Sequence, residues 1–196
     1  MNITSADYFT FNVNYSLLLL GQTGSGKSFL VERLIASRLA ALDPKKIQFA
    51  IFDLKQCFSS SLDIKPEYLL FDIERNGDEK TFQRLEDLAQ LCTERVLSHS
   101  TQPQVFIYIE ENDLARMDQE RFDKAILTIN RDARRTNMKL IYSTSSPSGS
   151  SVSEGLRDSF ELILAGPLLM TDHDVLRLPY TAHLKPLSFV VTENRS

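Results

Sequence analysis

The residues best suited to chemistry are the eight from Gly21 to Ser28, GQTGSGKS, which fit the pattern G-x-x-x-x-G-K-[ST] without a mismatch. In such a loop the glycines let backbone N–H groups surround phosphate oxygens, the lysine reaches the β- and γ-phosphates, and the hydroxyl holds Mg²⁺. Here these last two roles fall to Lys27 and Ser28. The loop predicts a site for ATP with Mg²⁺, and its candidate nucleotide-binding residues are Gly21, Gln22, Thr23, Gly24, Ser25, Gly26, Lys27, Ser28 and Phe29.

A phosphate-binding loop needs a strand before it and a helix after it. The apolar run at 15–20 reads as a buried strand. Behind the loop, apolar residues recur at helical spacing from Leu30 to Leu42, and Asp43-Pro44 ends the pattern. This context favours a phosphate site over a glycine-rich turn without a ligand.

An acidic pair, Glu110 and Glu111, follows the apolar run Val105–Ile109, which is typical of a central parallel strand buried on both faces. In a P-loop ATPase the first acid at this position helps to hold the Mg²⁺ shell, and the second polarises the water that attacks the γ-phosphate. We therefore predict a metal-binding role for Glu110, beside Ser28, and a catalytic role for Glu111. The alternative interpretation is a pair of solvated loop acids.

The remaining elements alternate between strands and helices. Strands are predicted at 47–52, 139–143, 160–165 and 187–192, a short apolar run lies at 68–71, and helices are predicted from Asp78, over 118–136 and near 171–176. This alternation is typical of a three-layer α/β domain with a mainly parallel central sheet. We expect residues 1–196 to form one domain, with a core at about 15–165 and a C-terminal extension at 166–196.

Composition and net charge argue against several classes of function. The 196 residues carry a net charge of −4 with a pI near 5.4, which argues against a uniformly basic nucleic-acid surface and leaves room for a local basic groove. The two cysteines, Cys57 and Cys92, show neither a CxxC nor a Cys/His cluster, so no disulfide framework or zinc site is expected. Neither a secretory leader nor a membrane span is recognisable, which predicts a cytoplasmic protein.

In their order, these features resemble the motor core of FtsK/HerA-type DNA translocases. The resemblance rests on GQTGSGKS, on Asp53-Leu54-Lys55 after the second strand, on Glu110-Glu111, and on RDARRTNMKLIYSTSSPS at 131–148. It implies a RecA-like P-loop ATPase that depends on Mg²⁺ and forms a ring, by resemblance a hexamer. It further implies a pump for double-stranded DNA in conjugation, segregation or packaging, with membrane or relaxase proteins as candidate partners.

The resemblance also implies that one subunit supplies a cationic side chain to the nucleotide bound by its neighbour. Arg134 lies where the family has the arginine of a Gly-Arg-Ala-type turn, so it is the first candidate for contacting the γ-phosphate of a neighbouring subunit. Arg135 and Arg157 are the alternates. The competing interpretation of Arg134 is a helix C-terminal arginine stabilised by the helix dipole.

Thr144 and Ser145 occupy the position of the family's nucleotide sensor. Ser145 stands where the family has a glutamine, and Ser146 stands where it has an arginine. For the strand-end pair Asp53 and Lys55, a structural ion pair is the favoured interpretation over a role in the site.

Two other functions stay open. A small-molecule kinase would be expected to carry an arginine-rich lid, and the serine-rich segment 143–153 contains no arginine. A nucleotide-binding module without turnover is compatible with the replaced sensor residues. A GTPase is disfavoured because the sequence has no N/T-K-x-D motif for reading guanine.

Overall fold

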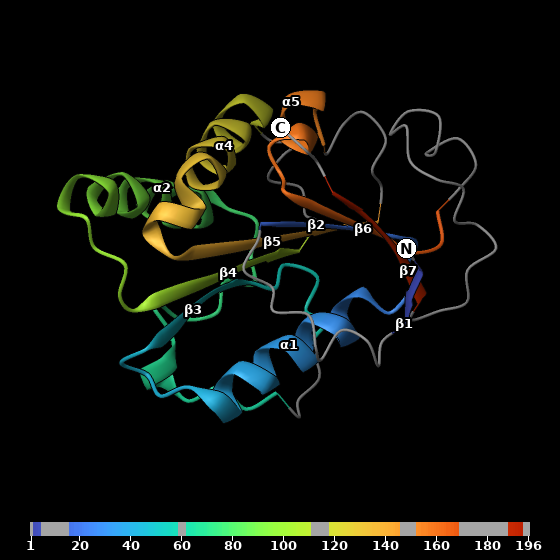
Figure 1. Cartoon of the computed structure of the whole chain (residues 1–196), viewed down its shortest axis with the longest axis horizontal. Helices are drawn as coiled ribbons and strands as arrows, with labels where there is room; N and C mark the ends of the chain where they lie inside the picture. Colours follow the sequence, from blue (N-terminus) through green and yellow to red (C-terminus); the bar gives the residue numbers. More distant parts are fainter. Residues whose placement is uncertain are drawn as a thin grey trace.

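A twisted β-sheet lies between two layers of helices (Figure 1). The computed structural model describes residues 2–4, 16–58, 62–110, 118–145, 152–168 and 188–193. Within these ranges seven strands form one sheet, in the order β1-β7-β6-β2-β5-β4-β3. The strands are β1 (Asn2–Thr4), β2 (Leu17–Leu20), β3 (Ile47–Phe52), β4 (Gln104–Glu110), β5 (Met138–Thr144), β6 (Leu162–Ala165) and β7 (Ser188–Glu193).

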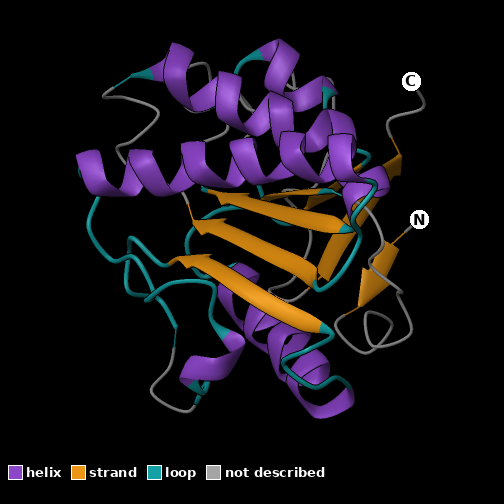
Figure 2. Cartoon of the chain, turned by 90° about the vertical axis from the view of Figure 1, so that its left-hand side faces the viewer, coloured by secondary structure: helices purple, strands orange, loops and turns teal. Residues whose placement is uncertain are grey.

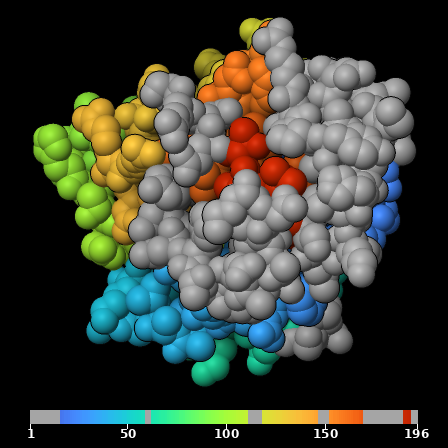
Figure 3. All heavy atoms as spheres, turned by 45° about the vertical axis from the view of Figure 1, so that its right-hand side comes forward, coloured from blue at the N-terminus to red at the C-terminus, as the bar shows by residue number. Residues whose placement is uncertain are grey.

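The five strands from β6 to β3 pair in parallel, and β7 is antiparallel to both β6 and β1. The prediction of a mainly parallel sheet is therefore confirmed. The antiparallel part forms one edge, where β7, in red, comes to the surface below the orange residues that include α5 (Figure 3). The strand β1 was not predicted, because three residues are too few to show a period.

The helices are α1 (Lys27–Ala41), α2 (Glu79–Ser98), α4 (Gln119–Thr136) and the short α5 (Glu154–Asp158). As Figures 1 and 2 show, α1 covers one face of the sheet, and α2 and α4 cover the other. Side chains of β4 alternate between the two layers: Val105, Ile107 and Ile109 pack on the α2 and α4 side, whereas Phe106 and Tyr108 pack on the α1 side. Both faces are buried, which explains the unbroken apolar run. The three-layer prediction is confirmed.

Local sequence signals set the ends of the long helices. Asp78 is the N-cap of α2 and accepts a hydrogen bond from the Thr81 N–H at 3.0 Å, as the sequence predicts. Asp118 caps α4 in the same way. At their C-terminal ends, His99 and Asn137 adopt the left-handed conformation and turn the chain towards β4 and β5.

The apolar run at 68–71 forms no strand of the sheet. Pro66–Tyr68 is a single 3-10 turn, and Leu69 makes an isolated bridge to Phe49. This segment covers the edge strand β3 and buries its outer side. The helix predicted near 171–176 lies outside the described residues.

Polar contacts hold α2 and α4 together near both ends. The Arg121 guanidinium pairs with Glu79 and Glu86 and lies over the Phe82 ring, 4.8 Å from its centroid. At the other end, Arg95 donates to the Thr136 carbonyl at 3.0 Å.

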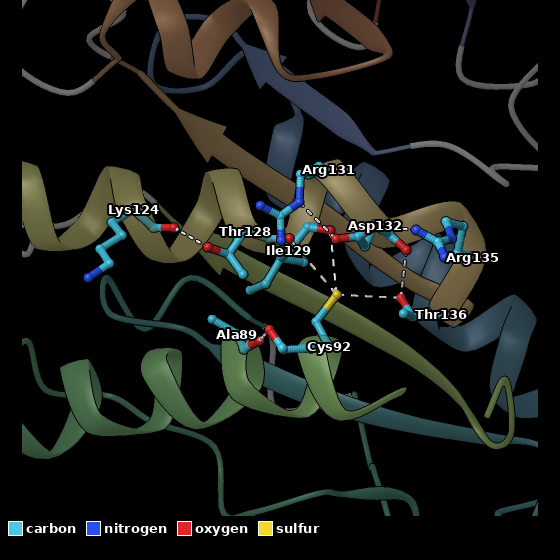
Figure 4. A network of polar contacts seen from close by, with 10 residues as sticks. Ala89, Cys92, Lys124, Thr128, Ile129, Arg131, Asp132, Arg135 and Thr136 are labelled. Carbon is cyan, nitrogen blue, oxygen red and sulfur yellow. Dashed lines mark hydrogen bonds and ion pairs between the residues drawn. The ribbon is translucent and has the colours of Figure 1, made fainter. Parts of the chain in front are cut away.

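Figure 4 shows the buried Cys92 thiol between the two helices, 3.5 Å from the Thr136 hydroxyl. The buried Asp132 carboxylate pairs with the more exposed guanidinium groups of Arg131 and Arg135, also on α4. The helical layer that backs the sheet is thus joined by charge-assisted contacts as well as by apolar packing.

Replacing Phe122 with alanine is expected to lower the free energy of unfolding by about 3–5 kcal/mol. The Phe122 ring is fully buried and lies 5.5 Å from the Tyr142 ring, so truncation leaves a cavity between α4 and the sheet. Urea unfolding followed by circular dichroism measures the change. The control is Leu97→Ala on α2, whose side chain is 77% exposed and whose truncation should change stability by less than about 0.5 kcal/mol. Equal effects of the two variants would contradict this account of the core.

Candidate functional site

The phosphate-binding loop connects the end of β2 to the start of α1, as the motif requires. Gly24 and Gly26 have φ angles of 83° and 96°, which side chains other than glycine rarely tolerate. At Gly21, an added Cβ would lie only 2.7 Å from the Ser25 hydroxyl oxygen. These glycines are needed for the shape of the loop.

Lys27 lies against the inner side of this loop. Its ammonium donates hydrogen bonds to the carbonyl of Gly21 and, at 3.2 Å, to that of Gln22. The side chain is 93% buried as the first residue of α1, yet it lines the pocket described next.

The carboxyl ends of the parallel strands meet beside the loop and form a pocket of about 280 Å³. In the sheet, Ser143 of β5 pairs with Glu110 of β4 on one side and with Leu19 of β2 on the other. This register brings the acid to the loop, and the Ser28 hydroxyl donates to the Glu110 carboxylate at 3.5 Å. The residues that line the pocket are Thr23, Gly24, Gly26, Lys27, Ser28, Phe29, Lys55, Cys57, Glu110, Ser143 and Ser145.

Glu110 is deeply buried, with 4% of its surface exposed. Burial raises the pKa of its carboxyl, and the negative charge of Asp53 acts in the same direction, while the Cys57 thiol, Lys55 and Lys27 oppose them. The hydroxyl of Ser28 and the carboxylate are oxygen donors of the kind that Mg²⁺ prefers. The residues present therefore fit a magnesium ion bound next to the phosphate loop.

Replacing Glu110 with glutamine is expected to raise the free energy of unfolding at neutral pH by about 1 kcal/mol. Because the folded-state pKa is above the ordinary 4.5, the folded protein disfavours the charged carboxylate. That cost is absent while the group is protonated in both states and grows as the pH rises through its ordinary pKa. Urea unfolding in EDTA from about pH 3.5 to about pH 8 measures it. A stabilisation that increases on acidification would contradict this sign.

The end of β5 contributes two serines to the pocket. Ser145 lines it, and its hydroxyl accepts a hydrogen bond from the Lys55 ammonium at 3.3 Å. Thr144, the other predicted sensor, is not among the lining residues; its carbonyl accepts from the Gly21 N–H at 3.3 Å. Its neighbour Ser143 lines the pocket instead, because side chains alternate along a strand.

The turn after β3 brings Asp53 to the site and also Cys57, which the sequence did not single out as a site residue. Asp53 is 98% buried and its carboxylate accepts from the Cys57 N–H at 2.8 Å, so it holds this turn as well as facing the site. Burial is the main cause that raises the pKa of the Cys57 thiol to about 11, and Glu110 adds to it. From the sequence, Cys57 could have been predicted as a site residue only by the general rule that the loops after parallel strands lie at the same edge of the sheet.

None of the three candidate arginines lines the described pocket. The guanidinium of Arg134 pairs with Glu161, whose second oxygen accepts from the Ser16 N–H at 2.9 Å. Ser16 precedes β2, so this cluster lies at the opposite edge of the sheet from the phosphate loop. Arg135 and Arg157 each pair with acids of their own helices. If one of these arginines takes part in hydrolysis, it must therefore contact the nucleotide of another subunit.

The proposed catalytic acid Glu111 lies outside the described residues, which resume at 118. Its role stays a prediction.

Comparison with known families supports the interpretation of this site. The sequence model of the FtsK/SpoIIIE family matches residues 3–70, which include β2, the phosphate loop, α1 and β3. The FtsK/HerA resemblance is confirmed. No curated protein sequence matches the chain.

Several solved structures have a similar fold. EssC (ATPases 2 and 3) from Geobacillus thermodenitrificans superimposes with a TM-score of 0.66 at 15% identity, over 92% of this chain and 38% of that one. The pCW3 conjugation coupling protein TcpA, in its monomer form with ATPγS, gives 0.62 at 14% identity, over 94% and 62%. The genome packaging NTPase B204 from Sulfolobus turreted icosahedral virus 2, in complex with AMP, gives 0.59 at 18%, over 93% and 94%.

The chain spans between a quarter and about two fifths of the length of three of the structures that it matches, two of EssC and one of the Type VII secretion ATPase EccC. Among the described residues, no helix is both long enough and apolar enough to cross a bilayer. At these identities the likeness to solved structures shows the fold alone.

Proposed function

We propose that the chain is the motor core of an ATP-hydrolysing, FtsK/HerA-type DNA translocase that works in the cytoplasm. The observation that carries the proposal is the 3.5 Å contact between the Ser28 hydroxyl and the Glu110 carboxylate. It joins the phosphate loop to the acid-bearing strand in one pocket, which is the arrangement that Mg²⁺-dependent phosphoryl transfer requires. A glycine-rich turn or a pair of solvated loop acids would not bring these two groups together.

The residues divide the chemistry as follows. Lys27 binds the β- and γ-phosphates, the backbone N–H groups of 21–28 surround them, and Ser28 with Glu110 holds Mg²⁺, which neutralises charge on the phosphates. Glu111 orients the attacking water. Lys55 donates a hydrogen bond to Ser145 at the pocket and supplies a positive charge from the same subunit. Such a charge is needed because this sequence has Ser146 in place of the family's sensor arginine.

The proposed assembly is a homo-oligomeric ring, by resemblance a hexamer. The transition state spreads negative charge over the γ-phosphate, and a cation from a neighbouring subunit stabilises it. Arg134 is the first candidate for this role because 66% of its side chain is exposed, despite its pairing with Glu161. Arg135, with 64% exposed, is the first alternate, and Arg157, with 12% exposed, is the second.

The proposed substrate of the motor is double-stranded DNA, moved in conjugation, segregation or packaging. TcpA is a conjugation coupling protein and B204 a genome packaging NTPase, so the fold serves DNA handling in two settings. Membrane or relaxase proteins are candidate partners in the first of them. The net charge of −4 requires that DNA contacts be confined to a local surface.

ATP hydrolysis is expected to rise several-fold when double-stranded DNA is added. Phosphate release from the purified chain, with and without DNA and Mg²⁺, measures this, and sizing under the same conditions shows whether a ring forms. Because phosphate contacts dominate DNA affinity, the stimulation should fall steeply with salt.

The other outcomes of this assay select among alternatives. Turnover that ignores DNA and needs a small phosphoryl acceptor would point to a kinase. Nucleotide binding without turnover under every condition would point to a binding module. ATP hydrolysis at the same rate with and without DNA would support the ATPase activity and contradict the proposal that the motor moves DNA.

A further inference from the structure

Three side chains with metal-binding atoms converge at the edge of the pocket. One carboxylate oxygen of Asp53, the Cys57 sulfur and one carboxylate oxygen of Glu110 all lie within 4.8 Å of one another. They come from the turn after β3 and from the end of β4, which are neighbouring strands. No local spacing in the sequence indicates this cluster, because Cys57 and Glu110 are 53 positions apart and no Cys/His spacing is present.

A second observation points to a ligand at this cluster. Glu110 is 96% buried, and its Oε2 atom has no hydrogen-bond partner among the described residues. Leaving a buried carboxylate oxygen without a partner costs free energy that a protein normally avoids. A cation bound between Asp53 and Glu110 would satisfy this oxygen and balance two buried negative charges.

We propose that Asp53, Cys57 and Glu110 form a site for a thiophilic divalent cation of the zinc class. Carboxylate oxygens alone would suit Mg²⁺ or Ca²⁺, whereas a sulfur ligand shifts the preference towards Zn²⁺, Co²⁺ and Cd²⁺. Three protein ligands with a fourth, open position make up the coordination of many zinc centres. The open position faces the pocket and takes water or an anionic ligand.

Only a small movement is needed to close the site. Zinc lies about 2.3 Å from sulfur and about 2.0–2.2 Å from carboxylate oxygen, so ligand atoms around one ion are about 3.5 Å apart. The Cys57 side chain is exposed and its thiol donates only a long hydrogen bond, 3.7 Å, to the Lys55 carbonyl, so rotation about its Cα–Cβ bond can make this adjustment. On binding, the metal–sulfur bond replaces the S–H bond, and the proton leaves to solvent.

This site goes beyond the proposed function and shares one residue with it. Glu110 belongs to the proposed Mg²⁺ shell through Ser28, whereas Asp53 and Cys57 approach from β3. A zinc-class cation at the new site would compete with Mg²⁺ for the Glu110 carboxylate. Its binding needs no nucleotide, so it can be tested whether or not the chain hydrolyses ATP.

The test is a titration of the nucleotide-free protein with Co²⁺, and separately with Cd²⁺, followed by absorbance. Thiolate ligation produces a charge-transfer band in the ultraviolet, and we expect it to saturate at one equivalent. Cys57→Ser should abolish the band. The matched control is Cys92→Ser, which removes the other thiol, buried between α2 and α4, and should retain it.

Asp53→Asn and Glu110→Gln should each weaken Co²⁺ affinity at least about tenfold, since loss of an outer-sphere partner alone costs that much. Circular dichroism of each variant checks that it is folded. A wild-type protein without the band, or a band that persists in Cys57→Ser, would overturn the proposal. Equal affinity in Asp53→Asn and the wild type would remove Asp53 from the site and likewise reject it.

Discussion

Replacing Lys27 with alanine is expected to lower the affinity for ATP at least about a hundredfold and to abolish measurable turnover. Each hydrogen bond between a charged lysine and a phosphate contributes about 1.5–3 kcal/mol, and Lys27 is placed to make one to each of two phosphates. Losing about 3 kcal/mol corresponds to a factor of about a hundred in Kd. Titration of a fluorescent ATP analogue measures the affinity, and phosphate release measures the turnover.

The control for this variant is Lys46→Ala, which removes the same charge from the turn between α1 and β3, where 67% of the lysine side chain is exposed. It should bind ATP as the wild type does. Because Lys27 also bonds to the carbonyls of Gly21 and Gln22, its variant must first be shown to be folded by thermal unfolding. Unchanged ATP affinity in a folded Lys27→Ala protein would remove the phosphate loop from the nucleotide site.

Replacing Glu111 with glutamine is expected to lower the rate of ATP hydrolysis by two to four orders of magnitude while ATP remains bound. A positioned general base contributes about 10²–10⁴ to the rate of a proton transfer, and glutamine keeps the shape of the side chain without its basicity. Because the residue acts on water and not on the phosphates, the Kd for ATP should stay within about threefold of the wild-type value. Single-turnover hydrolysis and equilibrium binding separate the two effects.

Asp113→Asn provides the control, because it removes one negative charge from the same segment at a position outside the acidic pair. We expect it to hydrolyse ATP at close to the wild-type rate. Normal turnover in Glu111→Gln would reject Glu111 as the water-positioning residue and would leave Glu110 as the acid to examine.

The phosphate site could be predicted because its chemistry is local. The loop from Gly21 to Ser28 is continuous in sequence, and its strand and helix follow from the apolar runs on either side. The caps at Asp78 and Asp118 are equally local, since each acid contacts a backbone N–H only three residues ahead. The parallel sheet followed from the alternation of strands and helices, although the position of each strand within it did not.

The amino-acid sequence by itself determined the nucleotide loop, the acidic strand end and the α/β architecture, because each depends on residue types at fixed short spacings. Tertiary structure alone decided which side chains meet. The register of β4 and β5 set Glu110 beside Ser143, and the alternation of side chains turned Ser143 rather than Thr144 into the pocket. Likewise, only the adjacency of β3 and β4 joined Asp53 and Cys57 to Glu110, since contacts between strands carry no signature in local spacing.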